Sequence, residues 1–434
     1  MSDDADARPP AGTRRLTRRR ALQWGLGGAG GTIGGLLTAA GGRAHAAPPG
    51  AAQVKLPGLL ASSELEANDT PAPAPPERRV GYAIVGLGHL ALNQILPAFG
   101  ATKLCRPVAL VSGDAAKAAA VAAEYGIDPK SLYDYKTFDR LRDDPKVDVV
   151  YVVLPNSMHA EYTIRAAQAG KHVLCEKPMA TSVADCQRMM EASRKADKKL
   201  MVAYRLQYEP YNREAIRVAR SGELGKLKSF RATNGQTQGD PRQWRLRKAL
   251  AGGGSLPDVG IYCLNAARYL SGEEPTEVSA TITTTPNDPR FTEVEEQVDF
   301  VLRFPSGFVA TCTTSYGFHD SKEFRLIGTG GWLALDPAFP YKGQLMRIAR
   351  KVSAGGMAAG AIEHRQLEPK DHFALEMDHL AARIRENKPP HTGGEEGLQD
   401  MRIIAAIYEA ARVGRRVALH APAQKDAFRG PAPG

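Results

Sequence analysis

Between residues 80 and 204, short runs of apolar residues alternate with longer segments in which apolar residues recur every three or four positions. Unbroken apolar runs are typical of strands in a parallel sheet covered on both faces, and the longer spacing predicts amphipathic helices. Strands are predicted at Val80–Val85, Pro107–Val111, Val147–Leu154, His172–Cys175 and Leu200–Tyr204. Helices are predicted from Leu92 to Phe99 and at Ala115–Tyr125, Met158–Ala169 and Val183–Lys195. This order predicts an N-terminal Rossmann domain, an α/β unit with a doubly wound parallel sheet, over residues 80–204.

Beyond Tyr204, apolar residues alternate with polar ones, which is typical of an antiparallel sheet with one face on the core. Strands are predicted at Leu227–Thr233, Glu277–Thr285, Gln297–Phe304, Phe308–Ser315, Glu323–Ile327 and Trp332–Leu335. Helices are predicted at Asn212–Arg220, Val259–Leu270 and Glu396–Gly414. We therefore expect residues 205–434 to form a C-terminal α+β domain with a large, mostly antiparallel sheet, which binds substrate and carries oligomer contacts.

The N-terminus has the order of an export signal. Arg18-Arg19-Arg20 precede an uncharged stretch from Trp24 to Gly42, and Ala44-His45-Ala46 follow it. The paired arginines resemble a twin-arginine signal, which is recognised by a receptor. The twin-arginine route exports proteins that are already folded. The alternative is a membrane-spanning helix, which the many glycines disfavour. We predict a twin-arginine signal over 1–46, read by the export machinery, then a Pro/Ala-rich arm over 47–79, a periplasmic location and no stable membrane anchor.

The charge and the cysteines exclude two classes of protein. The 434-residue chain has a net charge of +10, of which residues 1–46 carry +4 through seven arginines against three aspartates. The remaining charge is spread without a basic run, so we expect no nucleic-acid partner. The five cysteines show no C-x-x-C spacing, and no histidines have ligand spacing, so we expect no metal and no disulfide framework.

A glycine motif follows the first predicted strand. Gly86, Gly88 and Ala91 form G-x-G-x-x-A between a strand and a helix, the context that gives this pattern its meaning. Gly86 suits a tight turn, Gly88 lets the backbone approach a pyrophosphate, and Ala91 allows close packing of the helix. The helix N-terminus then faces the phosphate charge, so the motif predicts a dinucleotide site.

The end of the second predicted strand favours NADP over NAD. NAD-binding domains usually place an acidic residue there to bind the ribose 2′-hydroxyl. This chain has Ser112, and Lys117 lies one helical turn further on, a hydroxyl and a cation that suit a 2′-phosphate. Asp114 leaves the alternative open, because its carboxylate would repel that phosphate if it turned inward.

Three further motifs carry a resemblance to a known family. They are Glu176-Lys177-Pro178 at a predicted strand end, Asp258-Val-Gly-Ile-Tyr262 after Gly252–Gly254, and Gly394-Glu-Glu-Gly397. From about Arg79 to about Val417 the chain resembles the Gfo/Idh/MocA oxidoreductases. Tyr262, where many members have histidine, resembles the glucose–fructose oxidoreductase branch. The chain departs from that branch at His89-Leu90, at Pro257 and around Lys351–Ala361. The resemblance implies a homo-oligomer, a dimer or a tetramer.

The resemblance also implies a catalytic set of Lys177, Asp258 and Tyr262. Oxidising a sugar hydroxyl needs a base for the hydroxyl proton while hydride leaves for the nicotinamide. Tyr262 is the candidate base, and Lys177 is the cation that would stabilise its phenolate. Asp258 lies one helical turn before Tyr262, so that both project from the same face, and it could bind the sugar or tune Lys177. We expect the Lys177–Pro178 peptide to be cis or tightly turned, so that the amine reaches the nicotinamide.

Other site residues follow from the motifs and the resemblance. The cofactor-binding residues predicted are Gly86, Gly88, His89, Leu90, Ala91, Ser112, Gly113, Lys117, Tyr135, Leu154, Pro155, Asn156, His159, Glu176, Lys177, Arg205, Trp244, Arg245 and Tyr341. The substrate-binding residues predicted are Lys177, Arg205, Trp244, Asp258 and Tyr262. His159 suits a cofactor contact and a simple helix start equally well.

Four functions are compatible with these residues. The first is a sugar oxidoreductase that keeps its NADP bound, oxidises an aldose to its lactone and then reduces a second sugar, a ketose or an aldose. The second is an NADP-dependent sugar dehydrogenase with exchangeable cofactor. The third is an NAD-dependent glycosidase, which would release an aglycone in place of a lactone. A silent sugar-binding protein is the fourth, and the intact Lys177, Asp258 and Tyr262 argue against it.

Overall fold

The first unit is a six-stranded parallel sheet flanked by helices. The structure, a computed structural model, describes residues 79–354 and 357–433, so the predicted export signal and nearly all of the predicted arm lie outside the described residues. The strand order is β3-β2-β1-β4-β5-β6, with every neighbouring pair parallel. The strands are β1 (Val80–Val85), β2 (Cys105–Val111), β3 (Leu132–Tyr133), β4 (Val149–Val152), β5 (His172–Glu176) and β6 (Leu200–Ala203). The helices are η2 (Ala91–Ile95), α1 (Leu96–Ala98), α2 (Ala115–Tyr125), α3 (His159–Gln168) and α4 (Val183–Lys195).

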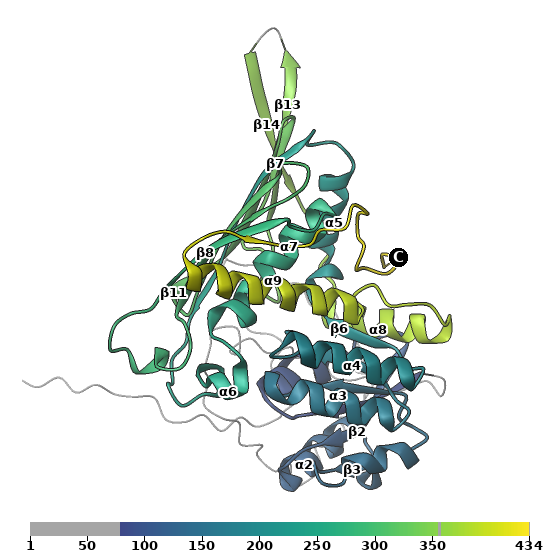
Figure 1. The fold of residues 1–434 in the computed structure, drawn as a ribbon. Coiled ribbons are helices and arrows are strands. Elements are labelled where there is room, and N and C mark those ends of the chain that lie inside the picture. The colour runs from purple at the N-terminus through teal and green to yellow at the C-terminus, as the bar shows by residue number, and fades with distance from the viewer. Residues whose placement is uncertain (1–78, 355–356, 434) are drawn as a thin grey trace, which may run out of the picture.

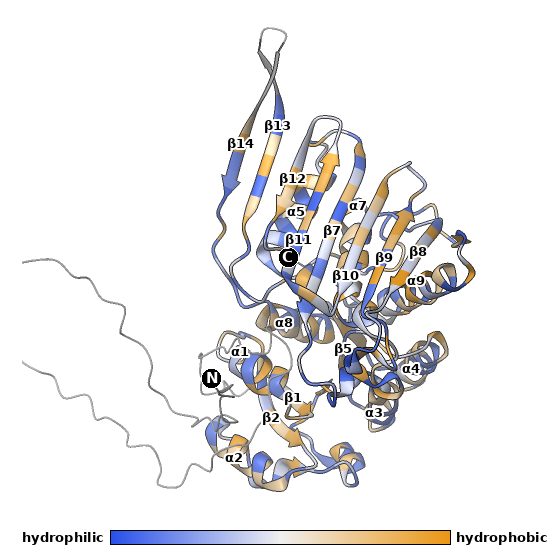
Figure 2. Cartoon of the chain, turned by 90° about the vertical axis from the view of Figure 1, so that its left-hand side faces the viewer, coloured by the Kyte–Doolittle hydropathy of each residue, from blue (hydrophilic) through white to orange (hydrophobic). Residues whose placement is uncertain are grey.

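The second unit is a nine-stranded sheet in the order β14-β13-β12-β11-β7-β10-β9-β8-β15. Neighbouring strands are antiparallel except for β10 and β7, which are parallel. The strands are β7 (Leu227–Thr237), β8 (Glu277–Thr283), β9 (Gln297–Arg303), β10 (Val309–Ser315), β11 (Gly317–Gly328), β12 (Gly331–Leu335), β13 (Met346–Ala354), β14 (Met357–Arg365) and β15 (Val417–Ala418). The helices are α5 (Pro210–Arg220), α6 (Lys248–Ala251), η8 (Leu256–Gly260), α7 (Ile261–Ser271), α8 (His372–Arg385) and α9 (Gly394–Val413). The predicted fold class is confirmed, and Figures 1 and 2 show the sheet with α7 and α9 against one of its faces.

Several elements were not predicted, among them the short elements β3, α6 and β15. The hairpin β13–β14, also not predicted, extends the nine-stranded sheet over the segment around Lys351–Ala361. Helix α8 was not predicted either, and it belongs to the core of the first unit although it follows β14 in the chain. Its residues Phe373, Met377 and Leu380 pack in one buried cluster with Tyr82 and Ile84 of β1.

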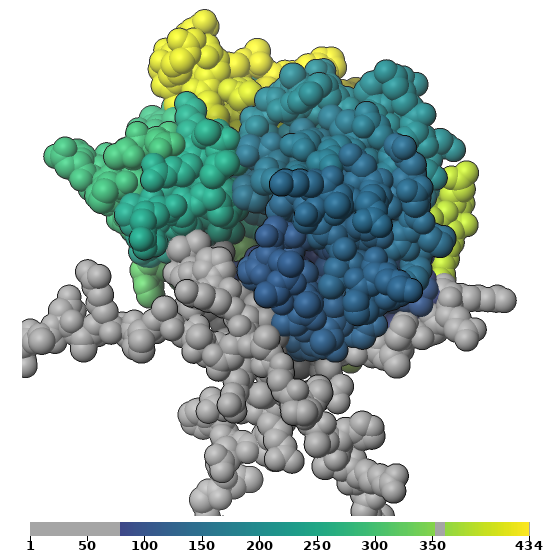
Figure 3. Space-filling view, turned by 90° about the horizontal axis from the view of Figure 1, so that it is seen from below, coloured from purple at the N-terminus to yellow at the C-terminus, as the bar shows by residue number. Residues whose placement is uncertain are grey.

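The apolar core lies on both faces of the first sheet. Alternate residues of β1 enter two different clusters, Ala83 and Val85 on one side and Tyr82 and Ile84 on the other. The first of these clusters continues without a break into the second sheet through residues such as Phe230 and Phe300. The two units therefore share apolar core, and Figure 3 shows them side by side in space-filling form. All five cysteines are buried free thiols.

Candidate active site

A cavity of about 580 Å³ lies between the carboxyl ends of the parallel strands and the second unit. In an open parallel sheet this edge is where ligands bind, because the chain reverses its winding there and leaves a crevice. Every predicted site residue except Ala91 lines this cavity. Ala91 is fully buried instead, in the cluster that joins the first helix to the sheet.

The glycines at the end of β1 form a cradle with no side chains. Gly86 has φ +96°, and a Cβ there would lie 2.2 Å from the carbonyl oxygen of Val153. A Cβ at Gly88 would meet no atom within 4 Å, so the backbone of Gly88 faces open space at the cavity wall. The cradle and the helix that follows it fit a pyrophosphate, which needs close backbone approach and N–H groups.

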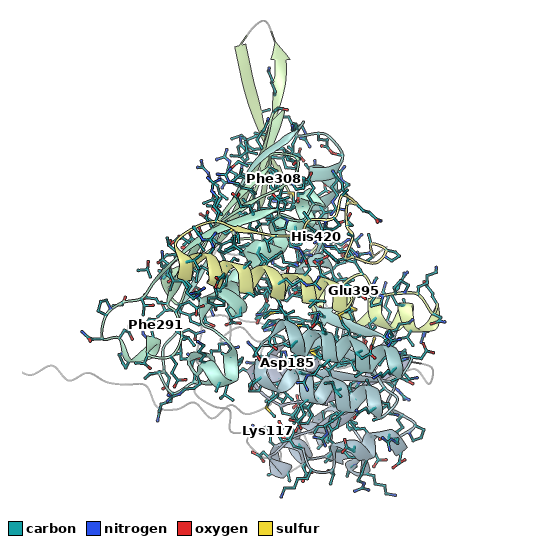
Figure 4. The ribbon with its side chains drawn as sticks, in the orientation of Figure 1. Lys117, Asp185, Phe291, Phe308, Glu395 and His420 are labelled. Atoms are coloured by element: carbon teal, nitrogen blue, oxygen red, sulfur yellow. The ribbon has the colours of Figure 1, made fainter. Side chains whose placement is uncertain are left out.

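Ser112 and Lys117, the residues predicted to face a ribose 2′-phosphate, line the cavity at the end next to α2. The Oγ of Ser112 accepts from the N–H of Asp114 at 3.1 Å, and Asp114 Oδ1 accepts from the N–H of Lys117 at 2.9 Å. Asp114 therefore caps the first turn of α2, although it also lines the cavity. Figure 4 shows Lys117 in the Rossmann unit, far from the Phe308 end of the second sheet. The cavity thus runs from α2 to the interface of the two units.

The ring of His159 lies between two chain segments at the cavity wall. Its Nδ1 lies 2.8 Å from the carbonyl oxygen of Pro178 and its Nε2 lies 2.9 Å from that of Leu154. Burial lowers the pKa of this imidazole, and the charge of Lys177 adds to that effect. A neutral imidazole has a single N–H, so the ring donates to only one of these two carbonyl oxygens, although it lies against both the segment after β4 and the turn after Lys177. That Lys177–Pro178 peptide bond is cis, as predicted.

Lys177 and Asp258 form an ion pair across the two units. Lys177 Nζ donates to the carbonyl oxygen of Asp258 at 2.7 Å and to its Oδ1 at 3.0 Å. The other oxygen, Oδ2, accepts from Arg245 Nε at 3.1 Å and from the hydroxyl of Tyr316 at 2.8 Å. Burial alone would raise the pKa of Asp258, but Lys177 and Arg245 outweigh it and hold this pKa well below its usual range. Asp258 is therefore a poor proton acceptor, and its position suits the tuning of Lys177.

Tyr262 lies between two cations. Lys177 Nζ is 4.8 Å from the centre of its ring and Arg205 Cζ is 5.0 Å from it. The ring stacks on Phe339 at 6.1 Å, which fixes its plane. Burial opposes the charge of Lys177, but Tyr262, Asp258 and Glu176 raise the pKa of Lys177 overall, so the amine stays cationic. Positive charge next to a tyrosine stabilises its phenolate, so Tyr262 has the surroundings of a general base.

The remaining predicted aromatic and basic residues form part of the cavity wall. The guanidinium of Arg205 lies 4.7 Å from the ring of Tyr341, and that of Arg245 lies 4.7 Å from the ring of Trp244. Arg205 donates to the carbonyl oxygens of Phe339 and Pro340 at 2.7 and 3.4 Å. Asn156 donates to the carbonyl oxygen of Ala251 at 2.9 Å and so links the two units behind the cavity.

Several residues that line the cavity, or that contact its lining residues, were not predicted from the sequence. Asn234, Gln236, Gln243 and Lys322 line the cavity from the second unit, and Tyr316, Tyr151 and Glu376 support it from behind. Asn234 and Gln236 stand two positions apart on β7, so strand alternation was a usable signal for them. No local pattern marks Tyr316 or Glu376, because their partners are distant in the sequence.

The chain matches family models over most of the two units. The model described as "Oxidoreductase family, NAD-binding Rossmann fold" matches residues 80–204, and the "GFO/IDH/MocA C-terminal domain" matches residues 212–334. Most residues that line the cavity therefore lie in the matched segments, and those outside them are Arg205, Phe339, Pro340, Tyr341 and Phe373.

Relatives and solved structures cover the same part of the chain. The chain is 32% identical over 349 residues to D-xylose 1-dehydrogenase [NADP(+)] of Haloarcula marismortui, covering 78% of this chain and 93% of that one. It is 28% identical to 1,5-anhydro-D-fructose reductase of Ensifer adhaerens, covering 77% of this chain and 97% of that protein. A crystal structure of aldose-aldose oxidoreductase from Caulobacter crescentus, complexed with glycerol, is 48% identical with a TM-score of 0.75, over 79% of this chain and all of that one.

Proposed function

This chain belongs to the Gfo/Idh/MocA oxidoreductase family and is an NAD(P)-dependent oxidoreductase acting on sugars, and on that premise we propose a more specific reaction. The protein keeps NADP bound, oxidises an aldose to its lactone, and reduces a second sugar, a ketose or an aldose, at the same site. The observation that carries this proposal is Tyr262 between the cations of Lys177 and Arg205, at the far end of a cavity that begins in a glycine cradle.

The residues divide the work by position. When bound, NADP supplies a nicotinamide that accepts a hydride or returns one. Gly86 and Gly88 would hold its pyrophosphate, and Ser112 with Lys117 would hold its 2′-phosphate. Tyr262 takes the proton of the sugar hydroxyl while the hydride leaves the same carbon, and it gives that proton to the second sugar in the reverse step. Asp258 orients Lys177 so that the amine stays next to the ring of Tyr262.

A retained cofactor agrees with the proposed location of the enzyme. The twin-arginine signal proposed for residues 1–46 would export the protein folded, with its nucleotide already loaded. Outside the cytoplasm free NADP is absent, so an enzyme that recycles one bound molecule needs no supply. Within the described residues no helix is long and apolar enough to cross a bilayer.

The first experiment identifies the nucleotide. We expect the purified protein to carry NADP without supplementation, and denaturation followed by chromatography should release it. Ser112→Asp should shift the nucleotide preference toward NAD, because a carboxylate would face the 2′-phosphate. Release of NAD alone, or an unchanged preference in the variant, would contradict the NADP assignment.

The second experiment separates the candidate reactions. Adding one aldose to the loaded protein should produce the absorbance of NADPH in a single turnover, with the lactone as product, and adding a second sugar should remove that absorbance. The NADP-dependent dehydrogenase among the relatives makes an exchangeable cofactor the main alternative. It would be indicated if turnover required free NADP and stopped on its removal. Release of an aglycone would indicate a glycosidase.

A further inference from the structure

Two glutamates share one hydroxyl directly behind the cavity. The hydroxyl of Tyr151, on β4, lies 2.8 Å from Glu176 Oε1 and 3.3 Å from Glu376 Oε1. Glu176 ends β5 and lines the cavity, whereas Glu376 lies on α8 and does not. Tyr151 and Glu376 are fully buried, and Glu176 is 7% exposed.

This geometry requires a proton on one of the glutamates. A tyrosine hydroxyl has one proton and can donate to only one of the two carboxyl groups, while an ionised carboxylate can only accept. Two carboxylates this close in a buried place cannot both be ionised without a large cost. The second carboxyl group must therefore donate to the oxygen of Tyr151, and it can do so only as an acid.

Of the two glutamates, Glu376 is the one that holds the proton before any transfer. Its Oε2 has no hydrogen-bond partner among residues 79–354 and 357–433, an arrangement that suits a neutral acid and not a carboxylate. Burial raises the pKa of Glu176 as well, but the cation of Lys177 next to it and the hydrogen bond from Tyr151 oppose this effect, so Glu176 takes the negative charge more readily than Glu376. Burial and the charge of Glu176 raise the pKa of Glu376 well above its usual value.

The surrounding charges do not remove the need for this proton. Arg205 is the cation that faces both glutamates, and its N–H groups donate to the carbonyl oxygens of Phe339 and Pro340. Asp371, at the start of α8, adds negative charge near Glu376. His372 lies against Arg205, and burial with the charge of Arg205 lowers its pKa well below its usual value, so it brings no positive charge.

We propose that Glu376 passes its proton to Glu176 through the hydroxyl of Tyr151, as an internal relay that responds to the charge of the bound cofactor. The proton of Glu376 goes to the oxygen of Tyr151, and the proton of Tyr151 goes to Glu176. One O–H bond forms for each that breaks, no electrons move, and no proton is taken from solvent. The negative charge moves from the cavity wall to a position behind it.

The relay would adjust the charge of the cavity wall to the oxidised and the reduced state of the cofactor. This role rests on the proposed position of the nicotinamide beside Lys177. An oxidised nicotinamide is a cation and favours a carboxylate at Glu176, whereas the reduced ring is neutral and does not. An enzyme that keeps one cofactor through two half-reactions meets both states in every cycle. The relay lets the charge of the cavity wall match each state without the exchange of a proton with solvent.

Infrared difference spectroscopy of the loaded protein tests the relay directly. Reducing the bound cofactor electrochemically should change the carbonyl absorption of protonated carboxyl groups in the wild type, because the acid moves from Glu376 to Glu176. Glu376→Gln should remove that change, since the amide has no proton to pass. Tyr151→Phe keeps the ring and both glutamates but removes the bridge, so the acid should remain without moving. A difference signal in this region that is the same in all three proteins would overturn the relay.

The redox balance of the bound nucleotide provides a second readout. In Glu376→Gln the charge stays on Glu176, so the oxidised cofactor should be favoured by about tenfold, which is about 30 mV for a two-electron couple. A shift of less than about twofold in both Glu376→Gln and Tyr151→Phe would also overturn the proposal. Neither measurement uses a sugar, so failure of the two-sugar reaction and failure of the relay are distinguishable. If Glu376→Gln does not fold, Tyr151→Phe still decides.

Discussion

Two clusters of charged side chains include residues of the helical segment that runs from η8 into α7. The site cluster consists of Lys177, Arg245 and Asp258, whose side chains are 11–18% exposed toward the cavity. The interior cluster consists of two arginines and three acids with exposures of 0–1%. Its members are Arg268, Arg429, Glu274, Glu396 and Asp400.

The two clusters differ in the sign of their excess charge. The site cluster has one cation more than it has carboxylates, and this remains true when Arg205 and Glu176 are counted with it. The interior cluster has one acid more than it has arginines. In the proposed reaction the excess cation beside Tyr262 stabilises the phenolate, whereas an excess buried acid has to keep a proton. The same residue types therefore suit the proposed chemistry in one place and join α7, α9 and the C-terminal segment in the other.

The largest effect should come from Tyr262→Phe, which removes the group that the site cluster serves. The phenyl ring keeps its stacking on Phe339 but cannot take a proton, so single-turnover reduction of bound NADP by an aldose should fall by about 10²–10⁴-fold. Reoxidation by the second sugar should fall equally, and nucleotide content and melting temperature should change little. A variant that keeps more than about a tenth of the rate in either direction would show that Tyr262 only packs.

Arg268→Met tests the interior cluster. It should lower the stability of the fold and leave the rate of the reaction unchanged. Removing the arginine leaves Glu274, Glu396 and Asp400 without their buried partner, which typically costs about 3–5 kcal/mol. Denaturant unfolding should show this loss, while the rate per folded molecule should remain near that of the wild type. A large loss of rate at full stability would mean that the interior cluster also positions the site.

Lys177→Met should lower the rate by about 10²-fold by removing the excess charge itself. The phenolate of Tyr262 then loses the nearer amine, so the pH of greatest activity should move upward in the activity that remains. A pH–rate profile of the variant checks this. Lys177→Arg keeps the charge and is the matched control, which should lose rate without moving the optimum as far.

Elements of this fold are predictable from the sequence where their ends carry local signals. Helix α2 was predicted with its observed bounds, because Asp114 caps its first turn and Gly126, at φ +64°, ends it. Helix α4 was likewise predicted correctly, with Ser182 as its cap. In contrast, the strand predicted from Pro107 begins at Cys105, since no turn residue marks its start.

What the sequence could not supply was contact between distant segments. The spacing of Phe373, Met377 and Leu380 on α8 is helical, but nothing local says that this helix packs on the first sheet. Tyr151 and Glu376 are 225 positions apart and share a hydrogen bond. The motif Glu176-Lys177-Pro178 was visible in the sequence, whereas the residues that set its electrostatics come from elsewhere in the fold.

The most gradual effect, and the smallest for one unit of pH, concerns the excess acid of the interior cluster and the pH dependence of stability. Burial raises the pKa of Asp400 to about 7, with Glu396 adding to the effect and Arg268 opposing it. Burial acts in the same direction on Glu396, but Arg268 and Arg429 outweigh it and lower its pKa to about 2. The folded protein therefore holds a proton on Asp400 that the unfolded chain releases above about pH 4. Stability should fall as the pH rises from about 4 to about 7, by at most about 1.4 kcal/mol per pH unit.

Asp400→Asn isolates this slope from the rest of the protein. Burial lowers the pKa of His172 to about 4 and that of His379 to about 3, so these histidines are neutral when folded and take up protons on unfolding. They make stability rise with pH over much of the same window, and this opposite slope is common to wild type and variant. The difference between the two unfolding curves should therefore show Asp400 alone, with the variant gaining on the wild type as the pH rises from 5 to 7. If the stabilities of the two proteins change in parallel with pH, Asp400 is ionised throughout, and the two arginines stabilise all three acids as carboxylates.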